Sequence, residues 1–138
     1  MEGMQRIQIQ LEHWETMQAH ILKCLPNEAC GILGGIGEKV YEVIPVTNEL
    51  HSPSRFRMEP AEQLAAMQRI EGMGHQMIGI YHSHIYGPEG PSTTDLDESY
   101  YPHVAYLVWS PSGKEWNCRS FRLIDRTAIE IPVLLNSE

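Results

Sequence analysis

Apolar residues recur in this chain with two different spacings, and the order of those spacings restricts the fold more than any other feature. Residues 5–10 alternate polar and apolar side chains, which is the period of a half-buried strand. Apolar side chains then follow at intervals of three or four over residues 11–25, the pattern of an amphipathic helix. A second helix is expected from Pro60 to Ile70, because proline suits the first turn of a helix. Two main helices therefore interrupt a chain of predicted strands.

The other expected strands lie between glycine- and proline-rich turns. They cover residues 30–35, 39–44, 77–84, 104–110 and 117–124, with a weaker strand near 128–135. Asp95–Ser99 is expected to form a short helical turn, and residues 47–58 an irregular loop. Helices and strands do not alternate strictly, so the pattern favours an α+β fold. A length of 138 residues suits one domain, which we place at residues 1–138.

Composition and charge exclude several classes of protein. The net charge is −8, which argues against a nucleic-acid partner because phosphate binding needs a concentrated basic surface. No apolar run approaches the roughly 20 residues needed to cross a bilayer. Residues 1–6 lack the pattern of a secretion signal, and Cys24, Cys30 and Cys118 form neither a disulfide framework nor a zinc ribbon. We expect a cytoplasmic protein without a membrane or nucleic-acid partner.

The segment from Tyr81 to Asp95 has the composition of a metal site. His82 and His84 are two residues apart on an expected strand, so their imidazoles should face the same way. Asp95 follows a Gly/Pro-rich loop and can supply a third ligand, leaving a fourth position open as in catalytic zinc sites. Two other interpretations remain open here. Most His-x-His pairs are surface or core residues, and Ser92 to Asp95 also has the form of a helix capping box.

The joint pattern is more specific than its parts. His82-x-His84, seven residues, Ser92, two residues and Asp95 together resemble the signature of the JAMM (also called MPN+) metalloproteases. That family also places a glutamate upstream, before Cys-Gly and small residues, and the segment Asn27 to Gly35, with Glu28, resembles it. The resemblance implies a single MPN-type (cytidine-deaminase-like) domain, in which a mixed, mostly antiparallel sheet packs with two main helices.

The resemblance also implies a role for each signature residue. His82, His84 and Asp95 would hold Zn²⁺, whose bound water has a pKa lowered to about 7. Glu28 would be the general acid/base that takes the proton of that water and delivers it to the leaving amine. Ser92 would donate a hydrogen bond to the oxyanion. Ser83 should point to the opposite face of the strand, so we assign it no catalytic part.

JAMM enzymes hydrolyse the amide bond after the C-terminal glycine of ubiquitin or a ubiquitin-like protein, and this chain is similar to the compact prokaryotic members. The implied partner is a ubiquitin-like or sulfur-carrier protein with a Gly-Gly tail, which can lie beside an exposed strand. Residues 47–60 resemble a loop of the sulfur-carrier-cysteine hydrolases, and we expect partner contacts there. No long insertion separates Asp95 from Val104, so we expect no chain-linkage specificity. A homodimer is left open.

Three alternatives compete with this interpretation. The same zinc chemistry could act on a small amide or a short peptide. A protein of the same fold could bind a ubiquitin-like partner without cleaving it. A metal-free structural domain would bind no stoichiometric zinc. The complete set of signature residues counts against the two alternatives without catalysis.

Overall fold

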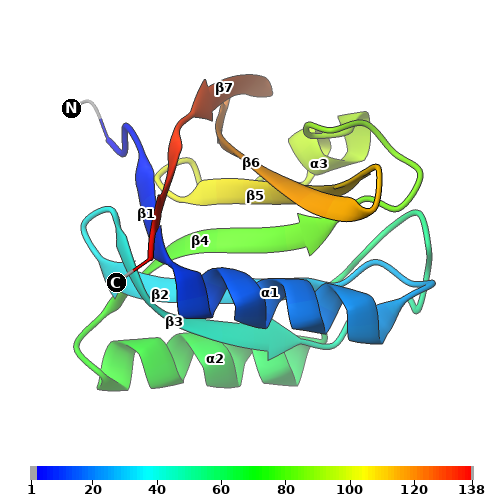
Figure 1. Cartoon of the computed structure of the whole chain (residues 1–138). Helices are drawn as coiled ribbons and strands as arrows, with labels where there is room; N and C mark the ends of the chain where they lie inside the picture. The colour runs from blue at the N-terminus through cyan, green and yellow to red at the C-terminus, as the bar shows by residue number, and fades with distance from the viewer. Residues whose placement is uncertain (1–2, 138) are drawn as a thin grey trace.

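The computed structural model describes residues 3–137, so the predicted domain of residues 1–138 extends past the described part at both ends. Figure 1 shows one twisted sheet with helices packed on it. The helices are α1 (Leu11–Cys24), α2 (Pro60–Gly72) and α3 (Thr93–Asp97). The strands are β1 (Ile7–Gln10), β2 (Cys30–Ile36), β3 (Lys39–Val46), β4 (Gln76–Ser83), β5 (Ala105–Ser112), β6 (Glu115–Ile124), β7 (Thr127–Ile131) and β8 (Val133–Asn136).

The strands form a single sheet in the order β7-β6-β5-β4-β2-β3-β1-β8. The pairs β2–β3, β2–β4, β5–β6 and β6–β7 are antiparallel. The pairs β1–β3, β1–β8 and β4–β5 are parallel. The sheet is therefore mixed and mostly antiparallel, as predicted. Its central strand β4 has both of its edges occupied, by β2 and by β5.

The two main helices cover opposite faces of the sheet (Figure 1). Buried residues of α1, Met17 and Ile21, belong to one core cluster, and Ala66 and Ile70 of α2 belong to the other. Neighbouring side chains of β4 reach both clusters: Ile80 packs on the α2 side and Tyr81 on the α1 side. The predicted α+β sandwich with two main helices is thus confirmed.

Tyr81 shows how closely the central strands approach the first helix. Its side chain is fully buried, and its hydroxyl lies 2.7 Å from Nδ1 of His20 on α1. The ring crosses the backbone of β2 at Gly31, where an added Cβ would lie 2.2 Å from a ring carbon. Only glycine leaves room for the ring at this point. Among the helices of residues 3–137, none is long and apolar enough to span a membrane.

Two expected elements differ in the structure. The weak strand predicted near residues 128–135 is two strands, β7 and β8, which lie at opposite edges of the sheet with Pro132 between them. Proline cannot donate a hydrogen bond to a sheet, so it suits this change of partner. The helical turn predicted at Asp95–Ser99 begins earlier, at Thr93, because Ser92 caps it. Figure 1 shows α3 at the end of the sheet toward which the arrow of β4 points.

Candidate active site

The C-terminal end of β4 places two imidazoles side by side. His82 is the next-to-last residue of the strand and pairs with both β2 and β5. His84 continues the strand direction because its N–H donates to the carbonyl of Trp109, at 2.8 Å. The two residues are only 2% and 4% exposed. Their Nε2 atoms are 3.0 Å apart, so the predicted common orientation is correct.

A helix cap brings Asp95 to these imidazoles. The Ser92 hydroxyl accepts a hydrogen bond from the Asp95 N–H at 3.1 Å, and the Asp95 carboxylate accepts one from the Ser92 N–H at 2.8 Å. The capping box that was an alternative interpretation is therefore present. It does not compete with a metal site, because the same cap orients the Asp95 carboxylate toward His82 and His84.

The three side chains form a compact group of donor atoms. Oδ2 of Asp95 lies 3.1 Å from Nε2 of His82 and 3.1 Å from Nε2 of His84. Tetrahedral zinc with bonds of about 2.0–2.1 Å separates neighbouring ligand atoms by about 3.4 Å, a few tenths of an ångström more than these distances. Two imidazole nitrogens and one carboxylate also match the donors that zinc prefers. His82, His84 and Asp95 can therefore hold a metal ion.

Neighbouring groups orient the two rings. Nδ1 of His84 lies 2.7 Å from the carbonyl oxygen of Pro88. A carbonyl can only accept, so Nδ1 carries the hydrogen and Nε2 is free to bind a metal, as in other histidine metal sites. The ring of Phe56 stacks on His82, with centroids 4.5 Å apart and an angle of 25°. Nδ1 of His82 is buried without a hydrogen-bond partner among the described residues.

Glu28 precedes β2 and is held by the hydrogen bonds of its own backbone and of the next residue. Its N–H donates to the carbonyl of Ser52 at 2.8 Å. The N–H of Ala29 donates to the hydroxyl of Ser83 at 2.8 Å, and the N–H of Ser83 donates to the carbonyl of Ala29 at 3.1 Å. Ser83 does face away from the two imidazoles, as predicted. It nevertheless fixes the segment that carries Glu28 beside them.

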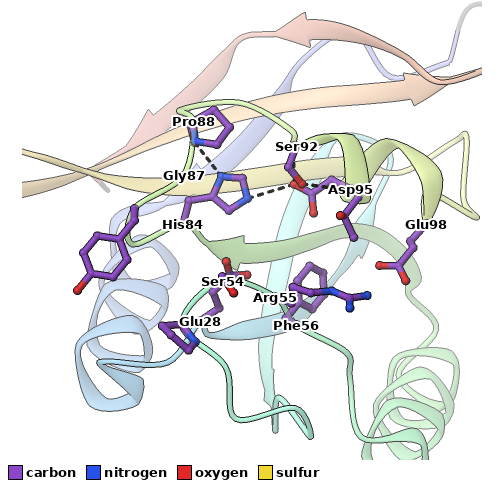
Figure 2. Close-up of a pocket in the computed structure, with 13 residues that line it drawn as sticks. Glu28, Ser54, Arg55, Phe56, His84, Gly87, Pro88, Ser92, Asp95 and Glu98 are labelled. Carbon is purple, nitrogen blue, oxygen red and sulfur yellow. Dashed lines mark hydrogen bonds and ion pairs between the residues drawn. The ribbon is translucent and has the colours of Figure 1, made fainter.

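Four of the five signature residues line one pocket, with a volume of about 240 Å³. Figure 2 shows His84, Ser92 and Asp95 on its upper side and Glu28 on its lower side, beneath His84. Loop residues 53–56 complete the lower side, and residues 86–88 lie beside His84. The structure thus brings together Glu28, His84, Ser92 and Asp95 around one cavity, and His82 joins them through the donor group described above.

Two of the carboxylates that line the pocket, those of Glu28 and Asp95, differ in their pKa. Burial raises the pKa of Glu28 to about 7, while the charge of His84 lowers it and that of Asp95 raises it. Burial also acts to raise the pKa of Asp95, but hydrogen bonds from His82, His84 and the Ser92 N–H outweigh it and hold that pKa well below its usual range. The pocket therefore contains one carboxylate that stays ionised and one that can exchange a proton near neutral pH.

The histidine and the thiol nearby also have shifted pKa values. Burial acts to lower the pKa of His84, but the Asp95 hydrogen bond, the Pro88 carbonyl and the charges of Asp95 and Glu28 raise it overall. Burial raises the pKa of the Cys30 thiol to about 12. A nucleophilic thiolate is therefore not available at neutral pH, which argues against thiol-protease chemistry.

Sequence reasoning missed several residues that shape the site. Asn48 and Phe56 lie in the loop where we expected only partner contacts, and Ser83 was assigned no part. No spacing rule identifies these residues, because each acts through a contact between segments far apart in the chain. The Pro88 carbonyl was equally hidden, although it belongs to the Gly/Pro-rich loop between the ligands.

Comparison with protein families gives a match over most of the chain. The profile described as prokaryotic homologs of the JAB domain matches residues 10–124. The chain is 34% identical over 121 residues to a CysO-cysteine peptidase from Mycobacterium tuberculosis, covering 86% of this chain and 83% of that protein. It is 37% identical over 107 residues to a desampylase from Pyrococcus furiosus, covering 76% of each chain.

Solved structures with the same fold agree with this match. Protein DSY2949 from Desulfitobacterium hafniense superimposes with a TM-score of 0.86 and 36% identity, covering 96% of this chain and 94% of the other. A JAB1/MPN domain protein from Archaeoglobus fulgidus superimposes with a TM-score of 0.58 and 18% identity, covering 93% and 99% of the two chains. The second likeness concerns the fold alone.

Proposed function

Because this chain belongs to the family of prokaryotic homologs of the JAB domain, we propose that it is a zinc-dependent peptidase that hydrolyses the amide bond after the C-terminal glycine of a ubiquitin-like or sulfur-carrier protein. Membership of the family confirms the predicted resemblance, and with it the predicted enzyme class, a peptidase of the JAMM type. The metal, the cleaved bond, the partner and the single domain over residues 1–138 are our proposal.

One observation carries this proposal. The three donor atoms of His82, His84 and Asp95 lie 3.0–3.1 Å apart, and the pocket beside them contains a carboxylate, Glu28, whose pKa is about 7. A group of ligands explains binding of an ion, whereas a proton-exchanging carboxylate next to it is what hydrolysis needs. A purely structural metal site has no need of such a neighbour.

Each residue has a defined part in the proposed reaction. His82, His84 and Asp95 hold the ion, and zinc bound there would supply Lewis-acid chemistry and lower the pKa of water to about 7. Ionised Glu28 accepts a proton from the attacking water and delivers it to the nitrogen of the leaving amine as the C–N bond breaks. The products are a carboxylate on the carrier and a free amine.

Ser92 can serve the helix cap and the reaction together. Its oxygen accepts the Asp95 N–H, which uses a lone pair and leaves the hydroxyl hydrogen available. Ser92 lines the pocket, so that hydrogen can be donated to the oxyanion that forms from the scissile carbonyl. The two roles considered for Ser92 from the sequence are therefore compatible.

The relatives suggest the class of partner. One is named for the cysteine adduct of CysO, two are named desampylases, and a relative from Thermus thermophilus is named as a probable TtuB-protein conjugate cleaving protease. We propose a partner of the same class, a small carrier with a C-terminal glycine. Residues 53–56 line the pocket and continue into the exposed part of the loop, so we propose that residues 47–60 contact the body of that carrier.

The test is a cleavage assay with the zinc-loaded protein. A ubiquitin-like sulfur carrier bearing a C-terminal extension after Gly-Gly is incubated with the wild type and with the Glu28→Gln variant, and its mass is followed. We expect the wild type to remove the extension and to stop after the glycine. General acid/base groups contribute about 10²–10⁴-fold, so the variant should be slower by about a thousandfold while still binding one zinc.

Other results would select an alternative. Bound zinc without cleavage of any carrier, but with cleavage of a short Gly-Gly peptide, would support a small-amide hydrolase. Bound zinc and carrier binding without any cleavage would support a binding module. Absence of stoichiometric zinc after purification without chelator would contradict the metal site itself. Equal rates for both proteins would show that Glu28 is not the general base.

A further inference from the structure

One buried amide outside the signature connects Glu28 to the loop that completes the lower side of the pocket. Asn48 is only 7% exposed, and its side chain makes four hydrogen bonds to backbone groups. Its Nδ2 donates to the carbonyls of Glu28 at 3.1 Å and Arg55 at 3.0 Å. Its Oδ1 accepts from the N–H groups of Leu50 and Arg57, both at 3.1 Å. The amide thus uses both of its hydrogens and both of its lone pairs.

The backbone partners of the Asn48 amide include Glu28 and the two neighbours of Phe56. Two of them are the backbone groups on either side of Phe56, whose ring stacks on the imidazole of His82. A third is the carbonyl of Glu28. One side chain therefore binds the residue proposed as general base and also fixes the residue that packs on a proposed metal ligand. The N–H of Glu28 adds a second connection to the same loop, through the carbonyl of Ser52.

We propose that Asn48 is a positioning residue, which sets the place of the Glu28 carboxylate relative to the group of His82, His84 and Asp95. The inference rests on the proposed function, because it assigns Asn48 a part in that reaction. Asn48 does not line the cavity that holds the signature residues, so it acts through Glu28 and Phe56 and not on the substrate.

Two variants remove different parts of this connection. Asn48→Ala removes all four hydrogen bonds. Asn48→Asp keeps the oxygen that accepts from Leu50 and Arg57, but places its second oxygen against the carbonyls of Glu28 and Arg55, where a donor is required. A displacement of about 1 Å in a catalytic group can cost about 10²-fold in rate. We therefore expect both variants to lose about 10–100-fold in kcat, with KM for the carrier changed by less than about threefold.

The control is a variant that destabilises the fold without touching the site. Ile70 is 1% exposed in the core cluster under α2 and lies against Gly34, at the end of β2 remote from Glu28. Ile70→Val should lower the free energy of unfolding by about 1 kcal/mol. Its kcat should equal that of the wild type. Zinc content, measured on all variants, should remain at one equivalent, because none of the ligands is changed.

Amide hydrogen exchange on the metal-free protein gives a readout that does not depend on turnover. In Asn48→Asp the Arg57 amide keeps its acceptor, whereas the Glu28 amide should exchange faster as its segment loosens. In Asn48→Ala both amides should exchange faster. Ile70→Val should change neither beyond its effect on global stability.

The outcomes separate this inference from the proposed function. The inference would be overturned if Asn48→Ala kept the wild-type kcat, or if Ile70→Val lost as much kcat as Asn48→Ala. A loss of kcat in Asn48→Asp alone would also overturn it, because that loss would be an effect of charge. If the wild type cleaves no carrier, the proposed function fails, and amide hydrogen exchange alone tests whether Asn48 positions Glu28. Faster exchange at Glu28 in both Asn48 variants would then still support its positioning by Asn48, and unchanged exchange would overturn it.

Discussion

Each side of the pocket presents a carboxylate, and the two sides shift its pKa in opposite directions. On the Asp95 side, two imidazoles and a backbone N–H lie against the carboxylate and hold its pKa well below the usual range, although burial acts to raise it. On the Glu28 side, burial dominates and raises the pKa to about 7. Both side chains are largely buried. Burial alone therefore does not decide the protonation of a carboxylate; the donors around it do.

This difference assigns roles before any substrate is considered. A carboxylate that stays ionised is suited to hold a cation, and one that exchanges its proton near pH 7 is suited to move a proton. The comparison also shows how each role is secured. Asp95 is held by its own side chain in the capping box with Ser92, whereas Glu28 is held through its backbone.

The largest effect is expected when a proposed metal ligand is removed from the Asp95 side of the pocket. His84→Ala should lose bound zinc and reduce turnover by about a thousandfold or more, equivalent to about 4 kcal/mol. Zinc content by elemental analysis and turnover of the carrier are measured together. His103, an exposed histidine outside the site, provides the control variant His103→Ala. Full activity of His84→Ala, or of wild type after complete chelation, would contradict the ligand assignment.

The next largest effect is expected at Ser92. Ser92→Ala should lower kcat by about a hundredfold, near 2.7 kcal/mol, if its hydroxyl stabilises the oxyanion. The same change removes a helix cap, which costs about 1 kcal/mol of stability. Ser92→Gly separates the two, because glycine is a better N-cap than alanine but has no hydroxyl. Turnover of Ser92→Gly close to wild type would show that the cap, and not the hydroxyl, matters for the reaction.

A third test measures the cost of ionised Glu28 in the metal-free protein. The pKa of Glu28 in the folded protein, about 7, lies above its ordinary value of 4.5. The contribution of Glu28 to the free energy of unfolding is therefore most favourable below about pH 4.5, and this advantage is lost as the pH rises through 7. Glu28→Gln should therefore match the wild type at pH 4 and be more stable by about 3 kcal/mol at pH 8. Urea unfolding at both pH values measures this.

The control for that measurement is Glu71→Gln, on the exposed surface of α2. It reports the effect of replacing a carboxylate by an amide outside the pocket. A difference between Glu28→Gln and wild type that is the same at pH 4 and pH 8 would contradict the raised pKa.

The smallest effect is the pH dependence of turnover. Glu28 must be ionised to accept a proton, so kcat/KM should increase with pH up to the pKa of Glu28. Below that pKa, each pH unit should lower kcat/KM about tenfold, or 1.4 kcal/mol. That pKa is about 7 without metal, and a bound dication favours the carboxylate and moves it lower. Rates measured from pH 5 to pH 8 test this. A rate that falls across this range would assign Glu28 the opposite protonation state.

Local pattern was sufficient for most of the fold. The start of α2 was predictable from Pro60, and the structure adds a cap by the Glu59 carboxylate, which accepts from the N–H groups of Ala61 and Glu62. The separation of β7 from β8 was not predictable, because it depends on which distant strand each segment joins. Periodicity identifies a strand from its own side chains but contains no information about its neighbours.

Some residues of the candidate site were also predictable from local pattern, and others were not. His82, His84 and Asp95 fall within one short segment, so the strand spacing of the histidines and the Gly/Pro-rich loop before Asp95 indicated a common site, which the family resemblance supported. Glu28 was placed with them through the family resemblance, since 54 residues separate Ala29 from the Ser83 hydroxyl that binds its N–H. Asn48 was not recognised at all. Its importance lies in four backbone partners that only the folded chain assembles.

The strand order restricts how a substrate tail can reach the site. An extended tail was expected to add itself to an exposed strand, but β4 has both edges occupied, and the outer edges of the sheet belong to β7 and β8. With strands spaced about 4.8 Å apart, these edges lie roughly 14 and 19 Å from β4 across the sheet. A tail that reaches Glu28 therefore cannot pair with β4. Irregular segments, residues 53–56 and 86–88, line the pocket instead, so we expect loop conformation, and not β4, to set the register of the tail.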